Sequence, residues 1–262
     1  MGKIIRNGVE YPSGGGGGGG SWITDIPEMH RNIYRGESLG NTVTADQLAA
    51  IADGSFDDLY VGDYWTIPVT IDNVEQSVNW RIADMDYWIG VGGNWGASGL
   101  TPIHDHHLVI VPDEALYTDS WSSSVALYPS GYIYTTGLTK AKTAINSVFT
   151  NLVLSHPRTM VHCRATDKVY YQTDIDLMSQ IMAYGYPTYG PRLTAWNGVS
   201  DAYQFALFRI APSFLRTTDS FWLTDITYDY YPVAVLNDGT PFAVATTQNR
   251  GVRPCFAIGT TS

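Results

Sequence analysis

A run of seven consecutive glycines, Gly14–Gly20, constrains the organisation of this chain more than any other feature. Glycine has no side chain to bury and loses more backbone entropy on ordering than other residues, so the run is expected to be a flexible linker. It separates a short N-terminal peptide from most of the 262-residue chain. We therefore expect four parts: a peptide over 1–13, the linker over 14–20, a connector over 21–43 and one folded domain over 44–262.

The peptide before the glycines has a strong signal for a β-hairpin. Asn7-Gly8 lies between two short apolar segments, and this dipeptide is favoured in the tight turns that join antiparallel strands. An isolated two-stranded hairpin is marginally stable in water, so we expect it to gain order by pairing with another protein. The alternative is a tail without structure or role. The residues expected to form the anchor are Ile4, Ile5, Val9 and Tyr11.

Composition narrows the classes of function. Charged residues make up 15% of the chain, below the roughly 25% typical of globular domains, whereas aromatic residues make up 13%. Such a surface is neutral, polar and aromatic, which is typical of extracellular binding modules. The net charge of −10 and the lack of any basic cluster argue against nucleic acid as a partner.

No segment predicts export or membrane insertion. The first residues contain no apolar run of signal-peptide length, and no later run approaches the roughly 20 apolar residues of a membrane span. We therefore expect synthesis and assembly in a cytoplasm. Cys163 and Cys255 lack metal-ligand spacing, and buried thiols are the favoured interpretation, with a disulfide between them as the alternative.

Three segments have the periodicity of amphipathic helices. Thr44 and Gln47 fit a capping box at the start of the first, which is expected to end at Asp53. The second helix is predicted over Leu138–Val153, where apolar residues form one stripe. The third is predicted over Asp174–Ala183, and Gly185 lies just past its end.

Short strands are expected over most of the remaining domain, because β-prone runs alternate with Gly and Pro. Together with the three helices they predict an α+β domain. A further hairpin is predicted at Asn237-Asp238-Gly239. The predicted strands are Tyr64–Ile67, Val69–Ile71, Trp80–Ala83, Leu108–Val111, Phe221–Leu223, Pro232–Leu236, Phe242–Ala245 and Arg253–Ile258.

Several motifs occur in the same order as in a family of phage and prophage proteins. They are Lys3–Tyr11 followed by glycines, Gly62–Trp65, Trp80–Ala83, His106–Asp113 and Gly251–Phe256. In these segments the chain resembles tail or minor structural proteins of phages from Gram-positive gut bacteria, whose domains are of unknown function. The likeness covers nearly the whole chain and is more specific for the family than for any activity. It implies a virion protein, assembled in the bacterial host cytoplasm and held in several copies by other virion proteins.

The C-terminal part also resembles C-type-lectin-like domains, including their formylglycine-generating-enzyme branch. The similarity rests on a Trp-centred strand at Phe221–Leu223, an irregular segment over Thr224–Thr247 and a closing strand at Val252–Pro254. It implies short, mostly antiparallel strands with two or three helices, and loops that form the ligand face. The calcium site of sugar-binding C-type lectins is not reproduced, because only Trp196–Gly198 is similar to one of its two motifs. Calcium-dependent sugar binding is therefore not expected.

The segment His104-Asp105-His106-His107 is the sharpest metal-like feature, because imidazole and carboxylate groups bind zinc or iron. In a strand, His104 and His106 would face the same side, but the sequence fixes no third ligand nearby. The alternative interpretation of His106-His107 is the entrance to a buried strand, and we expect no metal and no other cofactor. A tail-associated, metal-dependent hydrolase or depolymerase that uses His104, His106 and an aspartate is the alternative function.

Two aspartate pairs, Asp84 with Asp86 and Asp174 with Asp176, have spacings compatible with acid–base catalysis. Each pair is more often a solvated face or a turn, and no neighbouring motif recruits either one. The chain also lacks a nucleophile elbow, a phosphate loop and a dinucleotide fingerprint. We therefore expect that it is not an enzyme.

The C-terminal loops contain the residues expected to bind a ligand. Tyrosine offers a large contact area with few rotatable bonds, and Asn, Thr and Gln offer adaptable hydrogen bonding. The same aromatic residues could equally pack in the core. We expect a tail fibre, head fibre or decoration protein that binds a host-surface receptor or glycan; a decoration protein without a host ligand is a variant. The residues expected at the site are Trp222, Tyr228, Asp229, Tyr230, Tyr231, Asn237, Asp238, Gln248 and Asn249.

Overall fold

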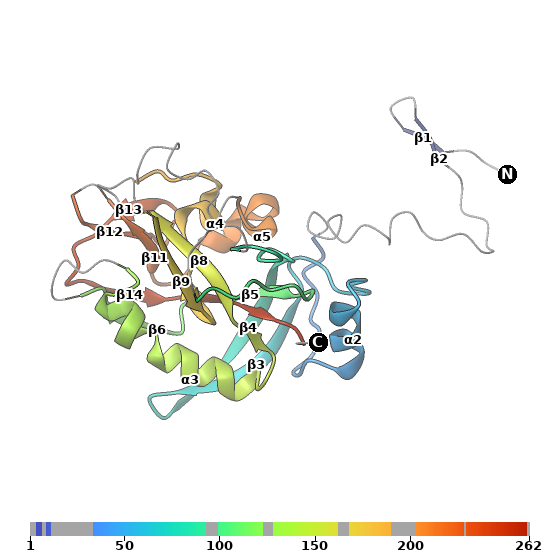
Figure 1. Cartoon of the computed structure of the whole chain (residues 1–262), viewed down its shortest axis with the longest axis horizontal. Coiled ribbons are helices and arrows are strands. Elements are labelled where there is room, and N and C mark those ends of the chain that lie inside the picture. Colours follow the sequence, from blue (N-terminus) through green and yellow to red (C-terminus); the bar gives the residue numbers. More distant parts are fainter. Residues whose placement is uncertain are drawn as a thin grey trace.

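Short strands dominate the part of the chain that the computed structural model describes, and short helices lie around them (Figure 1). The described residues are 4–6, 9–11, 34–92, 99–122, 128–161, 168–189, 203–227 and 229–260. Their strands form two larger sheets and two two-stranded sheets, and most neighbouring strands are antiparallel. This confirms the prediction of an α+β fold with mostly antiparallel sheets and few helices.

The six-stranded sheet has the order β10–β15–β5–β4–β3, and β7 pairs with one end of β15. Its strands are β3 (Tyr64–Ile71), β4 (Val74–Met85), β5 (Leu108–Pro112), β7 (Val153–Leu154), β10 (Ile175–Leu177) and β15 (Pro254–Ile258). The sequence predicted two strands on either side of Pro68, but β3 is one strand that pairs with β4 along its whole length. Pro68 is tolerated because β3 is an edge strand of the sheet, where a missing amide donor disrupts little.

The five-stranded sheet has the order β13–β12–β11–β14–β6. Its strands are β6 (Tyr117–Ser120), β11 (Phe221–Ile226), β12 (Pro232–Val235), β13 (Pro241–Ala243) and β14 (Asn249–Val252). The hairpin predicted at residues 237–239 is confirmed, since β12 and β13 pair across that turn. The chain then passes from β14 to β15, and Arg253 lies at this junction between the two sheets.

Hydrophobic residues form two core clusters, and the central strands of the six-stranded sheet contribute to both. Ile110 and Phe256 belong to one cluster, whereas Val109 and Ala257, their neighbours along β5 and β15, belong to the other. Both strands are therefore buried on two faces, which explains their continuous apolar sequence. Helix α3 (Thr139–Val148) lies along β3 and packs on the first cluster (Figure 1). Helices α4 (Gln180–Tyr184) and α5 (Ala206–Ile210) pack on the second.

Arg253 is a buried link between the sheets. Its guanidinium donates hydrogen bonds to the carbonyl oxygens of Pro112 and Phe214, each at 2.8 Å. It also lies over the rings of Phe208 and Phe221, with its Cζ atom 5.6 and 4.9 Å from their centroids. Burial lowers the pKa of Arg253 to about 10, so the side chain stays charged at neutral pH. The Val-Arg-Pro motif therefore has a structural role.

The helix predictions had mixed outcomes. Helix α2 (Ala45–Ala52) begins with the predicted capping box, in which the Thr44 and Gln47 side chains each accept a hydrogen bond from the other residue's amide. Helix α3 confirms the second prediction but ends at Val148, and a π-helical turn over Ile133–Gly137 precedes it.

The prediction of a third helix over Asp174–Ala183 was largely wrong. Ile175–Leu177 forms β10 and pairs with β15, so both apolar side chains of this segment enter the core from a strand. Only Gln180–Tyr184 is helical; the Ser179 side chain accepts a hydrogen bond from an amide of its first turn. Gly185 ends the helix with φ +82°, as predicted. Tertiary pairing with β15 has overridden the local helical pattern.

The folded domain extends ten residues before the boundary expected at residue 44. Asp63 is fully buried, and both of its oxygens accept hydrogen bonds from Arg35 at 2.8–3.2 Å. The same carboxylate accepts from the amides of Glu37 and Tyr60. Backbone pairing then continues along the edge of β3, where the Leu39 amide donates to the Tyr64 carbonyl. Asp63 therefore fastens the end of the connector to the domain.

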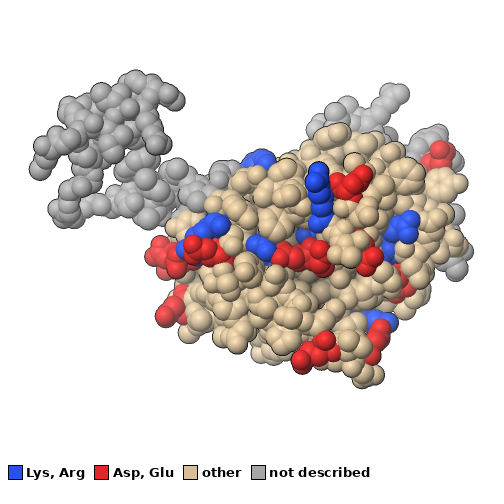
Figure 2. Space-filling model, turned by 180° about the vertical axis from the view of Figure 1, so that it is seen from behind, with Lys and Arg blue, Asp and Glu red and all other residues tan. Residues whose placement is uncertain are grey.

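Strands β1 (Ile4–Arg6) and β2 (Val9–Tyr11) pair antiparallel, with Arg6 opposite Val9, and this confirms the predicted N-terminal hairpin. Strands β8 (His156–Val161) and β9 (Lys168–Thr173) form another pair that the sequence did not indicate. None of the helices in the described residues is long and apolar enough to cross a membrane. Figure 2 shows one face of the molecule, on which basic and acidic side chains alternate and uncharged residues cover most of the area.

Candidate binding cleft

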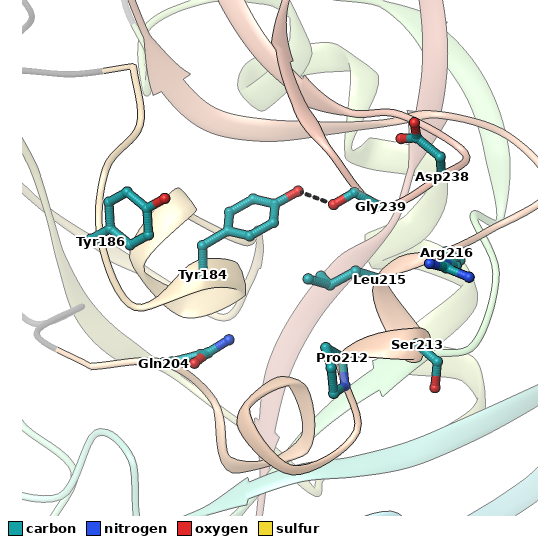
Figure 3. A pocket seen from close by; sticks show the side chains of 9 residues that line it. All are labelled: Tyr184, Tyr186, Gln204, Pro212, Ser213, Leu215, Arg216, Asp238 and Gly239. Carbon is teal, nitrogen blue, oxygen red and sulfur yellow. Dashed lines mark hydrogen bonds between the residues drawn. The ribbon is translucent and has the colours of Figure 1, made fainter.

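One hollow of the described surface, here named the tyrosine cleft, has a volume of about 480 Å³; Figure 3 shows the side chains that line it. It lies where α4, the 3₁₀ turn Pro212–Leu215 and the β12–β13 turn come together. Three distant parts of the sequence therefore build it. Its lining residues are Tyr184, Tyr186, Gln204, Pro212, Ser213, Leu215, Arg216, Asp238 and Gly239.

Hydrogen bonds hold the walls of the tyrosine cleft in place. The Tyr184 hydroxyl donates to the Gly239 carbonyl oxygen at 2.9 Å, so α4 is fixed to the β12–β13 turn (Figure 3). The Gln204 amide nitrogen donates to the Ala183 carbonyl at 2.8 Å and so orients the side chain. Gly239 has φ +87°, a conformation that favours glycine, and a Cβ atom there would lie 3.3 Å from Arg216 Cγ. The turn is therefore both tight and closely packed.

The ionisation of the cleft follows from its contacts. The Thr240 hydroxyl and amide donate to Asp238 Oδ1 at 2.7 and 2.9 Å; these bonds lower the pKa of Asp238, and the Arg216 charge adds to the effect. Burial, with a smaller contribution from Asp238, raises the pKa of Tyr184. The cleft thus presents the Asp238 carboxylate, the Arg216 guanidinium and the neutral phenol of Tyr184.

These groups suit a ligand rich in hydroxyl groups. Tyr186 is 59% exposed, so most of its ring is available for contact. Aromatic rings supply contact area to the apolar faces of such a ligand, while the carboxylate, guanidinium and amide groups accept or donate hydrogen bonds. The lining residues thus supply aromatic rings, one carboxylate, one guanidinium, one side-chain amide and one serine hydroxyl.

A smaller hollow of about 240 Å³ lies across the β12–β13 turn from the cleft, and is here named the asparagine hollow. Its residues come from β6, β14, the same turn and the segment before β11. Its lining is almost entirely polar. The lining residues are Thr118, Thr218, Asp219, Ser220, Asn237, Asn249 and Arg250.

The residues expected at the ligand site are distributed over several environments. Asp238 lines the tyrosine cleft, and Asn237 and Asn249 line the asparagine hollow, so the structure brings these three to neighbouring hollows. Asp229 and Gln248 are exposed but are not among the lining residues of either hollow.

The aromatic residues of that set differ in burial and in position. The structure corrects the prediction that Trp222 contacts a ligand, because this side chain is fully buried. Its Nε1 donates a hydrogen bond to the Asp119 carbonyl at 2.8 Å, and its ring packs on Trp121. Tyr230 is half-buried against the first core cluster. Tyr231 is 50% exposed but lines neither hollow, and Tyr228 lies outside the described residues.

Sequence reasoning missed the aromatic wall of the tyrosine cleft. Tyr184 and Tyr186 follow the predicted third helix, and Gln204 and Arg216 lie in segments to which the sequence assigned no role. The available signal was Gly185 between two tyrosines, because a helix that ends in a left-handed glycine leaves the residues around it at the surface.

The histidine segment does not form a shared metal centre among the described residues, where no group of three His, Cys, Asp or Glu side chains is arranged to hold a metal ion. His106 Nδ1 lies 2.7 Å from Asp86 Oδ2, and the His107 amide donates to Asp86 Oδ1 at 2.9 Å. His107 is buried, which agrees with its interpretation as the entrance to β5. His104 instead lines a separate hollow of about 470 Å³ with Asp105. The structure thus places His104 and His106 in different environments.

Neither aspartate pair acts as a unit. Asp84 is buried and accepts from the Ala206 amide at the start of α5, whereas Asp86 contacts the histidines. Asp174 pairs with Lys142 at 2.9 Å, and although burial would raise its pKa, the Lys142 hydrogen bond and charge lower it.

Asp176 is the buried member of the second pair. It accepts hydrogen bonds from Tyr128 and Tyr171 and pairs with Arg158 at 3.3 Å. Its carboxylate is fully occupied by this network, which holds β8 and β9 against β10.

Cys255 is buried on β15, and Cys163 lies outside the described residues. The predicted virion-anchor residues lie on β1 and β2. Comparisons of the chain with known protein families, with curated proteins and with solved structures found no significant match.

Proposed function

We propose that this chain is a bacteriophage virion structural protein whose folded domain binds a glycan of the host surface in the tyrosine cleft. The observation that carries the proposal is the cleft itself: exposed aromatic surface beside one carboxylate, one guanidinium and one oriented amide, on a domain with few charges. The host ligand in this proposal is a glycan rather than a protein, because the cleft is rich in hydrogen-bonding groups and aromatic rather than broadly apolar.

The N-terminal hairpin is the proposed attachment to other virion proteins, with Ile4, Ile5, Val9 and Tyr11 as its anchor. A two-stranded hairpin exposes unpaired backbone groups along both edges, so it can add to a sheet of a partner. The glycines after it let the domain search for ligand while it stays attached. Several copies on one particle would convert weak single contacts into strong attachment.

The finer fold that we propose is C-type-lectin-like. Two features support it: the Trp-centred strand β11 is followed by the β12–β13 hairpin, and the chain returns through β14 to a closing strand, β15. In this proposal the turn that borders the tyrosine cleft belongs to the ligand face. In this proposal, direct hydrogen bonds from the cleft take the place of the calcium site found in sugar-binding C-type lectins.

The virion assignment is tested by electron microscopy of purified particles labelled with an antibody against residues 34–262, together with binding of the recombinant full chain to host cells. Labelled particles with cell binding support the proposal. Labelled particles without cell binding leave the decoration variant. Unlabelled particles overturn the virion assignment.

The site assignment is tested by two matched substitutions. Tyr186→Ala is expected to reduce cell binding about tenfold, because it removes the most exposed aromatic surface of the cleft. Tyr231→Ala removes a ring of similar exposure that lies outside both hollows, and is expected to change binding little. Equal losses in both variants would place the site elsewhere.

A further inference from the structure

The tyrosine cleft and the asparagine hollow are walled by the same two chain segments, residues 215–220 and the turn at residues 237–239. Residues 215 and 216 line the cleft, whereas residues 218–220 line the hollow. In the facing turn, Asp238 and Gly239 line the cleft and Asn237 lines the hollow. The cleft and the hollow therefore share these two chain segments as walls.

Hydrogen bonds hold the strands and the segment that form the walls of the asparagine hollow. Asn249 lies on β14, where it pairs with Ser120 of β6, and the Gly251 amide donates to the Ser220 carbonyl at 2.6 Å. Arg250 is held by a 2.6 Å hydrogen bond from Nη2 to Gln248 Oε1. The backbone that carries these polar side chains is therefore held in place before a ligand binds, which lowers the conformational entropy lost on binding.

Each hollow contains one guanidinium and one carboxylate. Arg216 and Asp238 line the cleft, and Arg250 and Asp219 line the hollow. The charges cancel within each hollow, so neither attracts an anionic or a cationic ligand, whereas each offers charged donors and acceptors to hydroxyl groups. An acidic or a basic ligand would meet one like charge and one opposite charge in each hollow.

We propose that the ligand is an uncharged oligosaccharide that spans both hollows, with one part against the tyrosines and the next against Asn237, Asn249 and Arg250. This rests on the proposed glycan-binding function and adds the ligand's charge and minimum extent. A peptide fits less well, because no apolar side chain is among the lining residues of the asparagine hollow.

The test is binding of the full-length chain to an array of neutral oligosaccharides graded in length from single sugars upward, with uronic-acid and sulfated counterparts and a set of peptides. Longer neutral chains are expected to bind at least about tenfold more tightly than single sugars, since only they reach the second hollow. Asn249→Ala should remove about tenfold of that affinity and leave single-sugar binding unchanged. The matched control is Asn146→Ala, an exposed asparagine on α3, which should change neither.

Several results would overturn the inference: affinity that is independent of chain length, preference for the acidic counterparts, binding of peptides only, no binding to any neutral glycan, or an N249A variant that behaves like N146A. Failure of the proposed function is distinguishable. Unlabelled virions would reject the virion role but leave the array result intact. Loss of binding in Y186A without loss in N249A would keep the cleft and reject only its extension.

Discussion

The attachment of the connector to the domain makes a specific prediction about Asp63. In an Asp63→Asn variant the side chain keeps its shape but loses its charge and one of its two acceptor oxygens. In the native protein both oxygens are used, since each receives Arg35 and one backbone amide, from Glu37 or Tyr60. Whichever way the new amide is oriented, its NH₂ group faces one of those N–H donors.

The expected cost follows from these contacts. A buried donor left without a partner costs about 1–3 kcal/mol, and a lost hydrogen bond to a charged group costs about 1.5–3 kcal/mol. Part of the second loss is recovered, because Arg35 is partly exposed and also pairs with Asp58. We therefore expect a loss of about 3 kcal/mol, which corresponds to a fall in Tm of roughly 6–12 °C for a domain of this size.

The assay is thermal and urea unfolding, with hydrogen exchange of the amides that join the connector to β3. Exchange should accelerate at Leu39, Tyr64 and Thr66, whose amides donate across this junction. The matched control is Asp72→Asn, which breaks the exposed Lys140–Asp72 ion pair and should leave Tm unchanged. If D63N unfolds at the same temperature as D72N, Asp63 does not fasten the connector.

Three further predictions concern the core and the turn. Burial, with a smaller contribution from the Arg158 charge, lowers the pKa of His156 well below 6.5. The unfolded chain then binds the proton more readily, so stability should fall as pH drops below about 6.5, and His156→Gln should flatten this dependence in urea titrations. Trp222→Phe should cost about 1–3 kcal/mol, because it removes the hydrogen bond to Asp119, yet leave glycan affinity unchanged at low temperature; reduced affinity in the folded variant would return Trp222 to the site. Gly239→Ala should cost about 1–2 kcal/mol through its positive φ and lower glycan affinity by displacing Arg216, as unfolding and array binding would show.

Local patterns predicted the elements whose chemistry is local. The capping box at Thr44 and the two hairpins predicted from Asn7-Gly8 and from Asn237-Asp238-Gly239 are specified by neighbouring residues, and the structure has the capping box and both pairs of strands. The helix prediction after Asp174 was wrong because the segment fits two patterns. Its apolar residues at every third or fourth position fit a helix, while Ile175 and Leu177 also fit a strand. Pairing with β15 determines that these residues form a strand, and this pairing joins residues about 80 positions apart in the sequence.

The site was harder to predict than the fold, for a related reason. Polar residues of the β12–β13 turn were found, because a hairpin tip is exposed wherever the hairpin lies. The aromatic residues of the same region were assigned by composition, which cannot separate Trp222, a core residue, from Tyr186, an exposed one. What distinguishes them is the end of α4: Gly185 turns the chain outward, and the Tyr184 hydroxyl then meets the Gly239 carbonyl. A binding site assembled from three distant segments becomes visible only when those segments are brought together, so its aromatic half had to come from the structure.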